Sequence, residues 1–223
     1  MRTTLSILVL FLLAACSPGD PAIPAQAAAP VPPPAPTPAA DEPLVVFLGD
    51  SLTAGYGLGG EQAYPALVEK RLKEQGVPVH VLNAGVSGDT TAGGLSRLDW
   101  LLSQKPEVVV VGLGGNDGLR GLPLEQADRN LREIVRRSKA AGARVLLLGM
   151  QIPPNYGPEY AQGFADMYPR IAREMDVPLV PFLLEGVGGD EALNQADGIH
   201  PTAAGQEKVA DLVTPYVADV LSD

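Results

Sequence analysis

Five short apolar runs alternate with longer stretches in which apolar residues recur at helical spacing, and this alternation constrains the fold most. The runs cover residues 44–48, 79–82, 108–113, 144–148 and 178–180. The clearest helical patterns cover residues 64–75, 124–141 and 202–221. Buried parallel strands appear as short apolar runs, and helical crossovers connect them. The sequence therefore predicts an α/β fold: a three-layer α/β/α sandwich around a mainly parallel five-stranded sheet.

The first 42 residues lack this pattern. Residues 1–15 place Arg2 before a mainly apolar stretch and two alanines, which is the layout of a secretion signal and is too short to span a bilayer. Cys16, the only cysteine of the chain, follows directly. Residues 17–42 contain nine prolines and eight alanines, a composition typical of an extended, disordered tether. We therefore expect one folded domain over residues 43–223.

Residues 13–16, Leu-Ala-Ala-Cys, resemble the lipobox of bacterial lipoproteins. The resemblance implies that residues 1–15 are a lipoprotein signal peptide, that Cys16 is lipidated and that residues 16–42 tether the domain. Ser17 stands where an aspartate would imply retention in the inner membrane. We therefore expect a lipid-anchored protein of the bacterial cell envelope, in the outer membrane and facing the periplasm. An ordinary secretion signal with an incidental cysteine is the alternative.

The net charge and the small number of cysteine and histidine residues exclude several classes of partner. Acidic residues outnumber basic residues 26 to 16, for a net charge of −10, and no basic run is present to bind the phosphates of a nucleic acid. One cysteine and two distant histidines provide neither a disulfide framework nor a metal cluster. His80 lies inside an apolar run, so we expect it to be structural. We expect no metal, no nucleic-acid partner and a monomer.

Residues that can carry out chemistry follow the predicted strands. Ser51 comes after the first run, Gly88 after the second and Asn116 after the third, while Asp197 and His200 precede the last helix. The carboxyl ends of parallel strands share one edge of the sheet, where ligands bind. A hydroxyl, an imidazole, a carboxylate, a carboxamide and glycine amides are the components of a serine hydrolase.

Four segments surround these residues: 49–56, 83–90, 114–118 and 197–201. In their order, they resemble the blocks of the SGNH, or GDSL-type, hydrolase family over residues 44–221, which implies a flavodoxin-like fold. The chain is most similar to the bacterial periplasmic thioesterase, lysophospholipase and arylesterase branch, through residues 88–90, 114–121, 154–157 and 176–179. The resemblance implies hydrolysis of aryl esters, lysophospholipids and fatty-acyl thioesters through an acyl-serine intermediate, with no cofactor.

Carried over by position, the resemblance assigns a role to five residues. Ser51 would be the nucleophile, and Asp197 and His200 would complete the catalytic triad. The amides of Ser51 and Gly88 and the side chain of Asn116 would form the oxyanion hole. The chemistry agrees, because a serine hydroxyl needs an imidazole to accept its proton and the developing oxyanion needs preorganised donors.

Structural roles compete with these assignments. Ser51 alone could cap a helix, and Asp197 could cap a turn. Ser87 is the rival hydroxyl, but we expect it in a turn, and we expect Asp117 to satisfy a turn as well. We expect Asp50 to anchor a loop. Residues 55–60 match a dinucleotide fingerprint in form only, because they begin several residues after the strand; a flexible, substrate-facing loop is expected there.

The substrate groove is expected from apolar residues after the third and fourth strands: Leu119, Leu122, Ile152, Pro153, Pro154 and Tyr156. Loop packing is the alternative role for this set. Two further functions remain open. A polysaccharide or cell-wall O-acetyl esterase is disfavoured by the aromatic content of only 5%. A non-catalytic envelope lipoprotein is disfavoured because all four blocks are complete.

Overall fold

The computed structural model describes residues 42–222, so the signal segment and Cys16 lie outside the described residues. Five parallel strands form one sheet in the order β2-β1-β3-β4-β5. The strands are β1 (Leu44–Gly49), β2 (His80–Gly85), β3 (Val108–Gly112), β4 (Arg144–Leu148) and β5 (Leu179–Val180). The predicted five-stranded α/β sheet is confirmed.

The centre of the sheet is apolar on both faces. Val45 of β1 lies opposite Val81 of β2 and Val108 of β3, and this register continues to the glycines that end the strands. Residues 45–48 and 108–111 are completely buried. Parallel strands covered on both faces bury every side chain, which explains why these segments are continuous apolar runs and do not alternate with polar residues.

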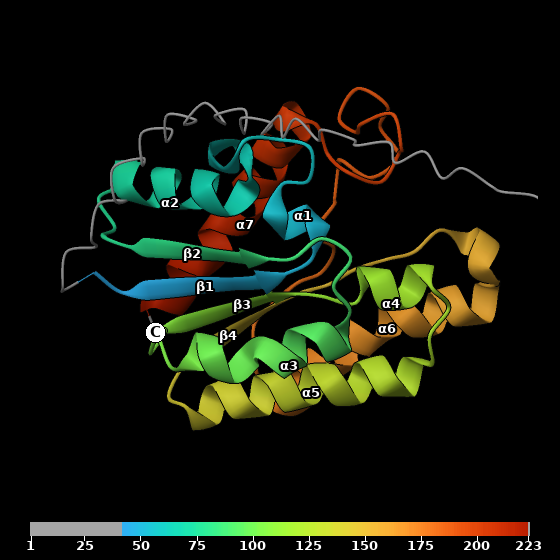
Figure 1. The fold of residues 1–223 in the computed structure, drawn as a ribbon, viewed down its shortest axis with the longest axis horizontal. Coiled ribbons are helices and arrows are strands. Elements are labelled where there is room, and N and C mark those ends of the chain that lie inside the picture. The colour runs from blue at the N-terminus through green and yellow to red at the C-terminus, as the bar shows by residue number, and fades with distance from the viewer. Residues whose placement is uncertain (1–41, 223) are drawn as a thin grey trace, which may run out of the picture. The chain divides into compact units, whose positions relative to one another are not determined.

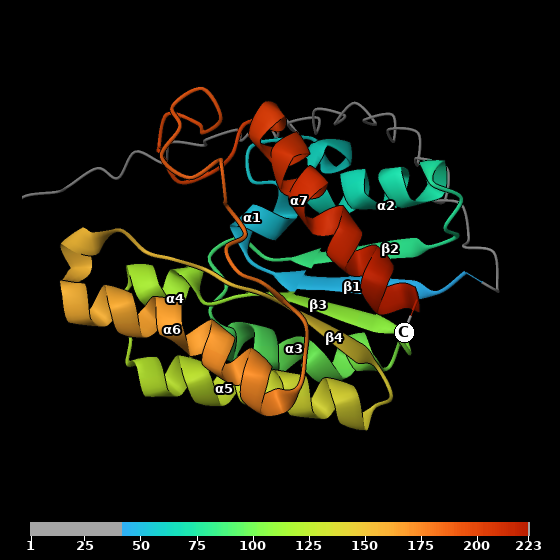
Figure 2. The same ribbon diagram turned by 180° about the vertical axis from the view of Figure 1, so that it is seen from behind.

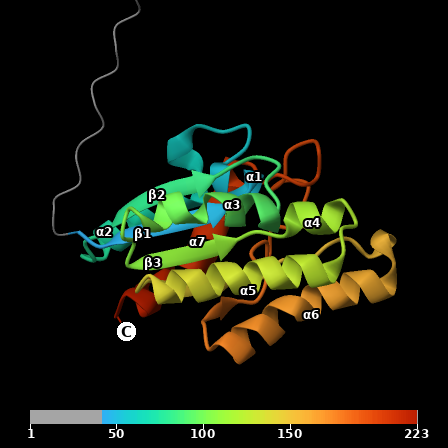
Figure 3. The same ribbon diagram turned by 60° about the horizontal axis from the view of Figure 1, so that its bottom comes forward.

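Helices cover both faces of the sheet and produce the predicted three layers. On one face lie α2 (Tyr64–Glu74) and α7 (Ala203–Ser222), which pack against each other (Figures 1 and 2). On the other face lie α3 (Thr91–Leu102), α5 (Leu124–Ala140) and α6 (Pro158–Met175), which come forward in Figure 3. Within the described part of the chain, no helix is long and apolar enough to cross a membrane.

The amphipathic pattern of α5 shows how the sequence places these helices. Its buried positions include Ala127, Leu131, Ile134 and Val135, which recur at intervals of three or four and therefore share one face. These are residues that the helical spacing predicted. The other face carries arginines paired with acidic residues of α5 and α6. Helix α5 thus packs its apolar stripe against the sheet and exposes its charges.

Short elements gather at the carboxyl edge of the strands. Helix α1 (Ser51–Ala54) follows β1 and helix α4 (Gly115–Leu119) follows β3, and both lie beyond the strand ends in Figure 1. Two short 3-10 helices, η1 (Gly60–Gln62) and η2 (Pro154–Tyr156), complete the set. The sheet neighbours of β1 are β2 and β3, so the chain order reverses there. Such a reversal opens a crevice at the carboxyl edge.

Candidate active site

Ser51 is held by the abrupt transition from β1 to α1. Asp50 is the N-cap of α1, and its Oδ1 accepts a hydrogen bond from the Leu52 amide at 3.0 Å. Ser51 is the first residue of the helix, so its own N–H has no intrahelical partner. A Cβ on Gly49 would lie 2.0 Å from the Oγ1 of Thr53, so this tight turn requires glycine. The strand end therefore fixes the hydroxyl and leaves an amide free beside it.

His200 joins Ser51 to Asp197. Its Nε2 lies 2.8 Å from the Oγ of Ser51, and its Nδ1 lies 2.7 Å from Oδ2 of Asp197. Oδ1 of Asp197 accepts the amides of Ile199 and His200. The hydrogen bond from the His200 amide, followed by those from its ring and from the Ile199 amide, lowers the pKa of Asp197 to about 2. Asp197 is therefore ionised and fixes the orientation of the imidazole.

The loop that carries His200 is tied to the loop after α1. The side-chain Nε2 of Gln195 donates to the carbonyls of Tyr56 and Pro201, and the main-chain N–H of Gln195 donates to the His200 carbonyl. The ring of Tyr56 packs on the imidazole, with centroids 4.6 Å apart and planes tilted by 38°. Through Tyr56, the loop over residues 55–60, which the sequence predicted to face the substrate, supports the imidazole.

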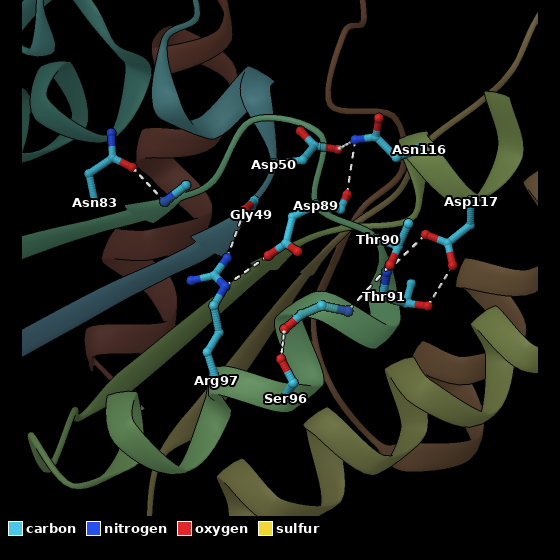
Figure 4. Close-up of polar contacts among 12 residues, drawn as sticks. Gly49, Asp50, Asn83, Asp89, Thr90, Thr91, Ser96, Arg97, Asn116 and Asp117 are labelled. Carbon is cyan, nitrogen blue, oxygen red and sulfur yellow. Dashed lines mark hydrogen bonds and ion pairs between the residues drawn. The ribbon is translucent and has the colours of Figure 1, made fainter. Parts of the chain in front are cut away.

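Asn116 lies on α4, and its carboxamide points toward Asp50 and Asp89 (Figure 4). Its Nδ2 donates to the main-chain carbonyl of Asp89 at 2.9 Å and lies 3.4 Å from Oδ2 of Asp50 (Figure 4). Gly88 precedes Asp89 and adopts a φ of +81°, a backbone conformation that favours glycine. The loop after β2 and the helix after β3 are thus joined through the Asn116 side chain.

Asp50 is a buried carboxyl at the centre of this site, with 2% of its surface exposed. Burial raises its pKa to about 6, although the Leu52 amide and the positive charge of His200 act in the opposite direction. Its hydrogen bond to the Leu52 amide agrees with the loop-anchoring role expected from the sequence. Its contact with Asn116 was not expected.

Asp117 has a structural role that goes beyond a local turn. Its carboxylate accepts the amide of Thr91 at 2.8 Å and the hydroxyl of Thr91 at 2.7 Å (Figure 4), and the Thr91 hydroxyl also accepts from Asn130 of α5. Asp117 is 3% exposed. This buried network joins α4 to the first turn of α3 and to α5, and it therefore fixes the helix that carries Asn116.

A cavity of about 590 Å³ opens beside Ser51 and His200. Leu119, Ile152 and Pro153 line it, as the sequence suggested. Leu122 does not line it, because it lies in the turn before α5, where its carbonyl accepts the Tyr160 hydroxyl. Tyr156 does not line it either and is 39% exposed in η2. The cavity beside Ser51 therefore includes Leu119, Ile152 and Pro153 of the set expected from the sequence.

Sequence reasoning missed several walls of this cavity. Met150 follows β4, and Phe182 and Leu184 follow β5; all three line the cavity. Ligands bind at the carboxyl ends of parallel strands, so the positions after β4 and β5 are the sequence signal that points to these three residues. Ile199 also lines the cavity and lies between Asp197 and His200 in the sequence. Among residues 42–222, no group of three His, Cys, Asp or Glu residues is placed to hold a metal ion.

A hydroxyl in contact with an imidazole, which in turn contacts a carboxylate, is the arrangement that defines a serine hydrolase. The GDSL-like Lipase/Acylhydrolase family model matches residues 47–208, and the chain belongs to this family. It is therefore an acyl hydrolase, and the predicted family is confirmed.

The chain is similar in sequence to known hydrolases over most of their lengths. Esterase TesA of Pseudomonas aeruginosa is 48% identical, over 82% of this chain and 91% of the relative. Thioesterase 1/protease 1/lysophospholipase L1 of Escherichia coli K12 is 44% identical, over 78% and 82%. A crystal structure of TesA aligns with a TM-score of 0.77 at 47% identity, covering 79% of this chain and 99% of the other. The predicted fold class is confirmed by this likeness.

Proposed function

We propose that this protein is a serine esterase and thioesterase in which Ser51 is the nucleophile, His200 the general base and acid, and Asp197 the residue that orients the imidazole. The observation that carries the proposal is the pair of contacts made by His200, 2.8 Å to the Ser51 hydroxyl and 2.7 Å to the Asp197 carboxylate. Both lie within the range of strong hydrogen bonds.

The reaction proceeds by two acyl transfers. The Oγ of Ser51 forms a bond to the substrate carbonyl carbon while its proton passes to Nε2 of His200. The tetrahedral intermediate then breaks its bond to the alcohol or thiol, which leaves with the proton from His200. Water attacks the acyl-serine in the same way, again giving a proton to His200, and the carboxylic acid departs as Ser51 recovers its proton. Asp197 stabilises the imidazolium in each step.

Three donors are suited to bind the oxyanion. The Ser51 amide has no intrahelical partner, and the Gly88 amide belongs to the neighbouring loop. One N–H of Asn116 binds the Asp89 carbonyl, whereas the other has only Asp50 at 3.4 Å, a distance at which a hydrogen bond is weak. This second N–H can therefore turn to a substrate oxygen. Loss of one such donor typically costs about 2.7–4 kcal/mol of transition-state stabilisation.

The cavity favours substrates with an extended acyl chain. Its walls include Leu119, Met150, Ile152, Phe182 and Leu184, and it adjoins the Ser51 hydroxyl. An acyl chain gains about 0.8 kcal/mol for each methylene that it buries. Lysophospholipids, aryl esters and fatty-acyl thioesters all present such chains or rings, whereas an acetyl group would leave most of the cavity unused. A polysaccharide O-acetyl esterase is therefore the weaker alternative.

The site of action that we propose is the bacterial cell envelope. The support is the Leu-Ala-Ala-Cys sequence at residues 13–16, which is similar to a lipobox, and the proline-rich segment over residues 17–42. Lipidation of Cys16 would place the hydrolase near the lipid surface of the outer membrane. Mass spectrometry of the N-terminal peptide, isolated from bacterial membranes, would detect the acyl chains on Cys16.

The activity test compares the full chain with two alanine variants. Ser51→Ala removes the proposed nucleophile, and Ser87→Ala removes an exposed serine of the adjacent loop as a matched control. Hydrolysis is measured on p-nitrophenyl esters from acetyl to palmitoyl and on palmitoyl-CoA. We expect Ser51→Ala to lose at least about a thousandfold in kcat and Ser87→Ala to retain kcat within about twofold.

The acyl-chain profile separates the two esterase proposals. Highest kcat/KM on medium or long chains would support the substrate class proposed here. A sharp preference for acetyl would instead support the O-acetyl esterase. Equal turnover by wild type and Ser51→Ala would contradict the proposed nucleophile.

A further inference from the structure

Asp89 carries a partly buried ion pair directly behind the loop of Gly88. Its Oδ2 accepts Nε of Arg97, a residue of α3, at 2.8 Å, and the two side chains are 13% and 23% exposed (Figure 4). A Cβ on Gly93 would lie 1.8 Å from Oδ1 of Asp89. Helix α3 therefore leaves space for this carboxylate by having no side chain at residue 93. None of these residues takes part in the chemistry proposed above.

The same guanidinium also reaches the end of β1. Nη2 of Arg97 donates to the main-chain carbonyl of Gly49 at 3.0 Å, and the amide of Val86 donates to that carbonyl as well. Gly49 is followed by Asp50 and Ser51, so Arg97 is bound two residues before the nucleophile. We call Arg97, the Asp89 carboxylate and the Gly49 carbonyl the Arg97 clasp.

Asp89 connects the Arg97 clasp to the groups proposed to bind the oxyanion. The main-chain carbonyl of Asp89 accepts the Asn116 carboxamide at 2.9 Å. The residue before Asp89 is Gly88, whose carbonyl accepts Nη2 of Arg120 at 2.8 Å. Movement of Asp89 would therefore displace both Gly88 and the acceptor that orients Asn116.

We propose that Arg97 is a positioning residue of the oxyanion hole. Its guanidinium binds Asp89 and the Gly49 carbonyl together, and it thereby fixes the positions of the Gly88 amide and the Asn116 carboxamide relative to Ser51. The inference rests on the proposed function. The planar guanidinium directs N–H groups to two acceptors at once, which the single ammonium of lysine cannot do in the same geometry. The ion pair of Arg97 with Asp89 therefore fixes β1, α3 and the loop after β2 relative to one another.

The test compares Arg97→Met and Arg97→Lys with Arg132→Met. Arg132 is a matched control because it pairs with Asp128 and Glu174, is 29% exposed, and lines no part of the Ser51 cavity. For each full-length variant, kcat and KM are measured on p-nitrophenyl butyrate together with the midpoint of thermal unfolding. The Ki of an alkyl trifluoromethyl ketone is measured as well, because its adduct with the serine hydroxyl carries an oxyanion.

We expect Arg97→Met to lower kcat by about ten- to a hundredfold, to change KM by less than about threefold, and to raise the Ki of the ketone by the factor that kcat loses. Arg97→Lys should recover part of the loss. Arg132→Met should keep kcat and Ki within about twofold of wild type, even if its midpoint of thermal unfolding falls as much as that of Arg97→Met.

Asp89→Asn provides a second, independent variant. If Asp89 and Arg97 act as one unit, the double variant Asp89→Asn/Arg97→Met will lose no more kcat than the more impaired of the two single variants. Native kcat and Ki in Arg97→Met, beside an active wild type whose turnover requires Ser51, would overturn this inference alone. A wild type without ester hydrolysis would overturn the proposed function, and this inference with it.

Discussion

At the residue scale, the site combines groups whose protonation is set by very different surroundings. Asp197 is partly exposed and accepts three hydrogen bonds from N–H groups, which keep it ionised. Asp50 is buried and has its pKa raised to about 6. Two carboxyl groups close to one imidazole therefore differ in role: one orients the imidazole, and the other caps α1 at an electrostatic cost.

That cost gives a stability prediction for Asp50→Asn. The pKa of about 6 in the folded protein lies above the ordinary aspartate pKa of about 3.9, so the folded state binds the proton more tightly than the unfolded state does. The contribution of Asp50 is therefore fully favourable below about pH 4 and is lost as the pH rises through 6. Asparagine can still accept the Leu52 amide and does not ionise. Relative to wild type, the free energy of unfolding of Asp50→Asn should gain about 2 kcal/mol between pH 4 and pH 7.

Urea denaturation at several pH values would measure this difference. The exposed Asp219→Asn controls for the loss of one negative charge. A constant difference between Asp50→Asn and wild type over this pH range would show that burial does not govern the ionisation of Asp50.

At the scale of elements, the position of Ser51, the proposed nucleophile, depends on how closely α1 approaches β2. Gly85 ends β2, and a Cβ there would lie 2.3 Å from the main-chain nitrogen of Ala54. Asn83 strengthens the same contact, because its Nδ2 donates to the Thr53 carbonyl at 2.8 Å and its Oδ1 accepts the Gly85 amide. Strand β2 thus supports the helix that carries Ser51.

Gly85→Ala should therefore damage both stability and catalysis. The new methyl group would meet main-chain atoms, so α1 would have to move and Ser51 would move with it. We expect a loss of about 2 kcal/mol in the free energy of unfolding and at least about a tenfold loss in kcat. Gly60→Ala is the control, because a Cβ at residue 60 meets nothing within 4 Å. Native kcat in Gly85→Ala would refute the proposed dependence.

The elements also show where local sequence patterns suffice. The apolar period of α5 and the runs of β1 and β3 predicted their elements closely, because burial on one face or on both leaves a periodic signal. Strand β5 gives a weaker signal, because it has only two residues. Its short apolar run does not reveal that Phe182 and Leu184, which follow it, line the cavity. Leu122 was assigned to the groove because its position after β3 does not reveal which way the turn directs it.

At the scale of the whole molecule, the net charge of −10 bears on which acyl donors approach the site. A negative protein repels an anionic substrate, and salt screens this repulsion. Two substrates with the same acyl chain separate this charge effect from binding in the cavity. Octanoyl-CoA is multiply anionic, whereas p-nitrophenyl octanoate is neutral.

We expect kcat/KM for octanoyl-CoA to rise by about threefold between 20 and 200 mM NaCl, while that for p-nitrophenyl octanoate changes little. Both substrates are measured below their critical micelle concentrations with the same enzyme preparation. A fall in the octanoyl-CoA value with salt would instead show that local cations such as Arg120 dominate the approach to the site.

The sequence by itself determined the α/β class and the periodicities of the helices and strands, and it indicated the residues that we propose to react. Burial and chemical type leave local patterns along the chain. Only the tertiary structure decided that His200 meets Ser51 across 149 residues, that Tyr56 packs on the imidazole and that Arg97 joins Asp89 to the end of β1. Such contacts depend on how distant elements pack in three dimensions, and no period along the chain encodes them.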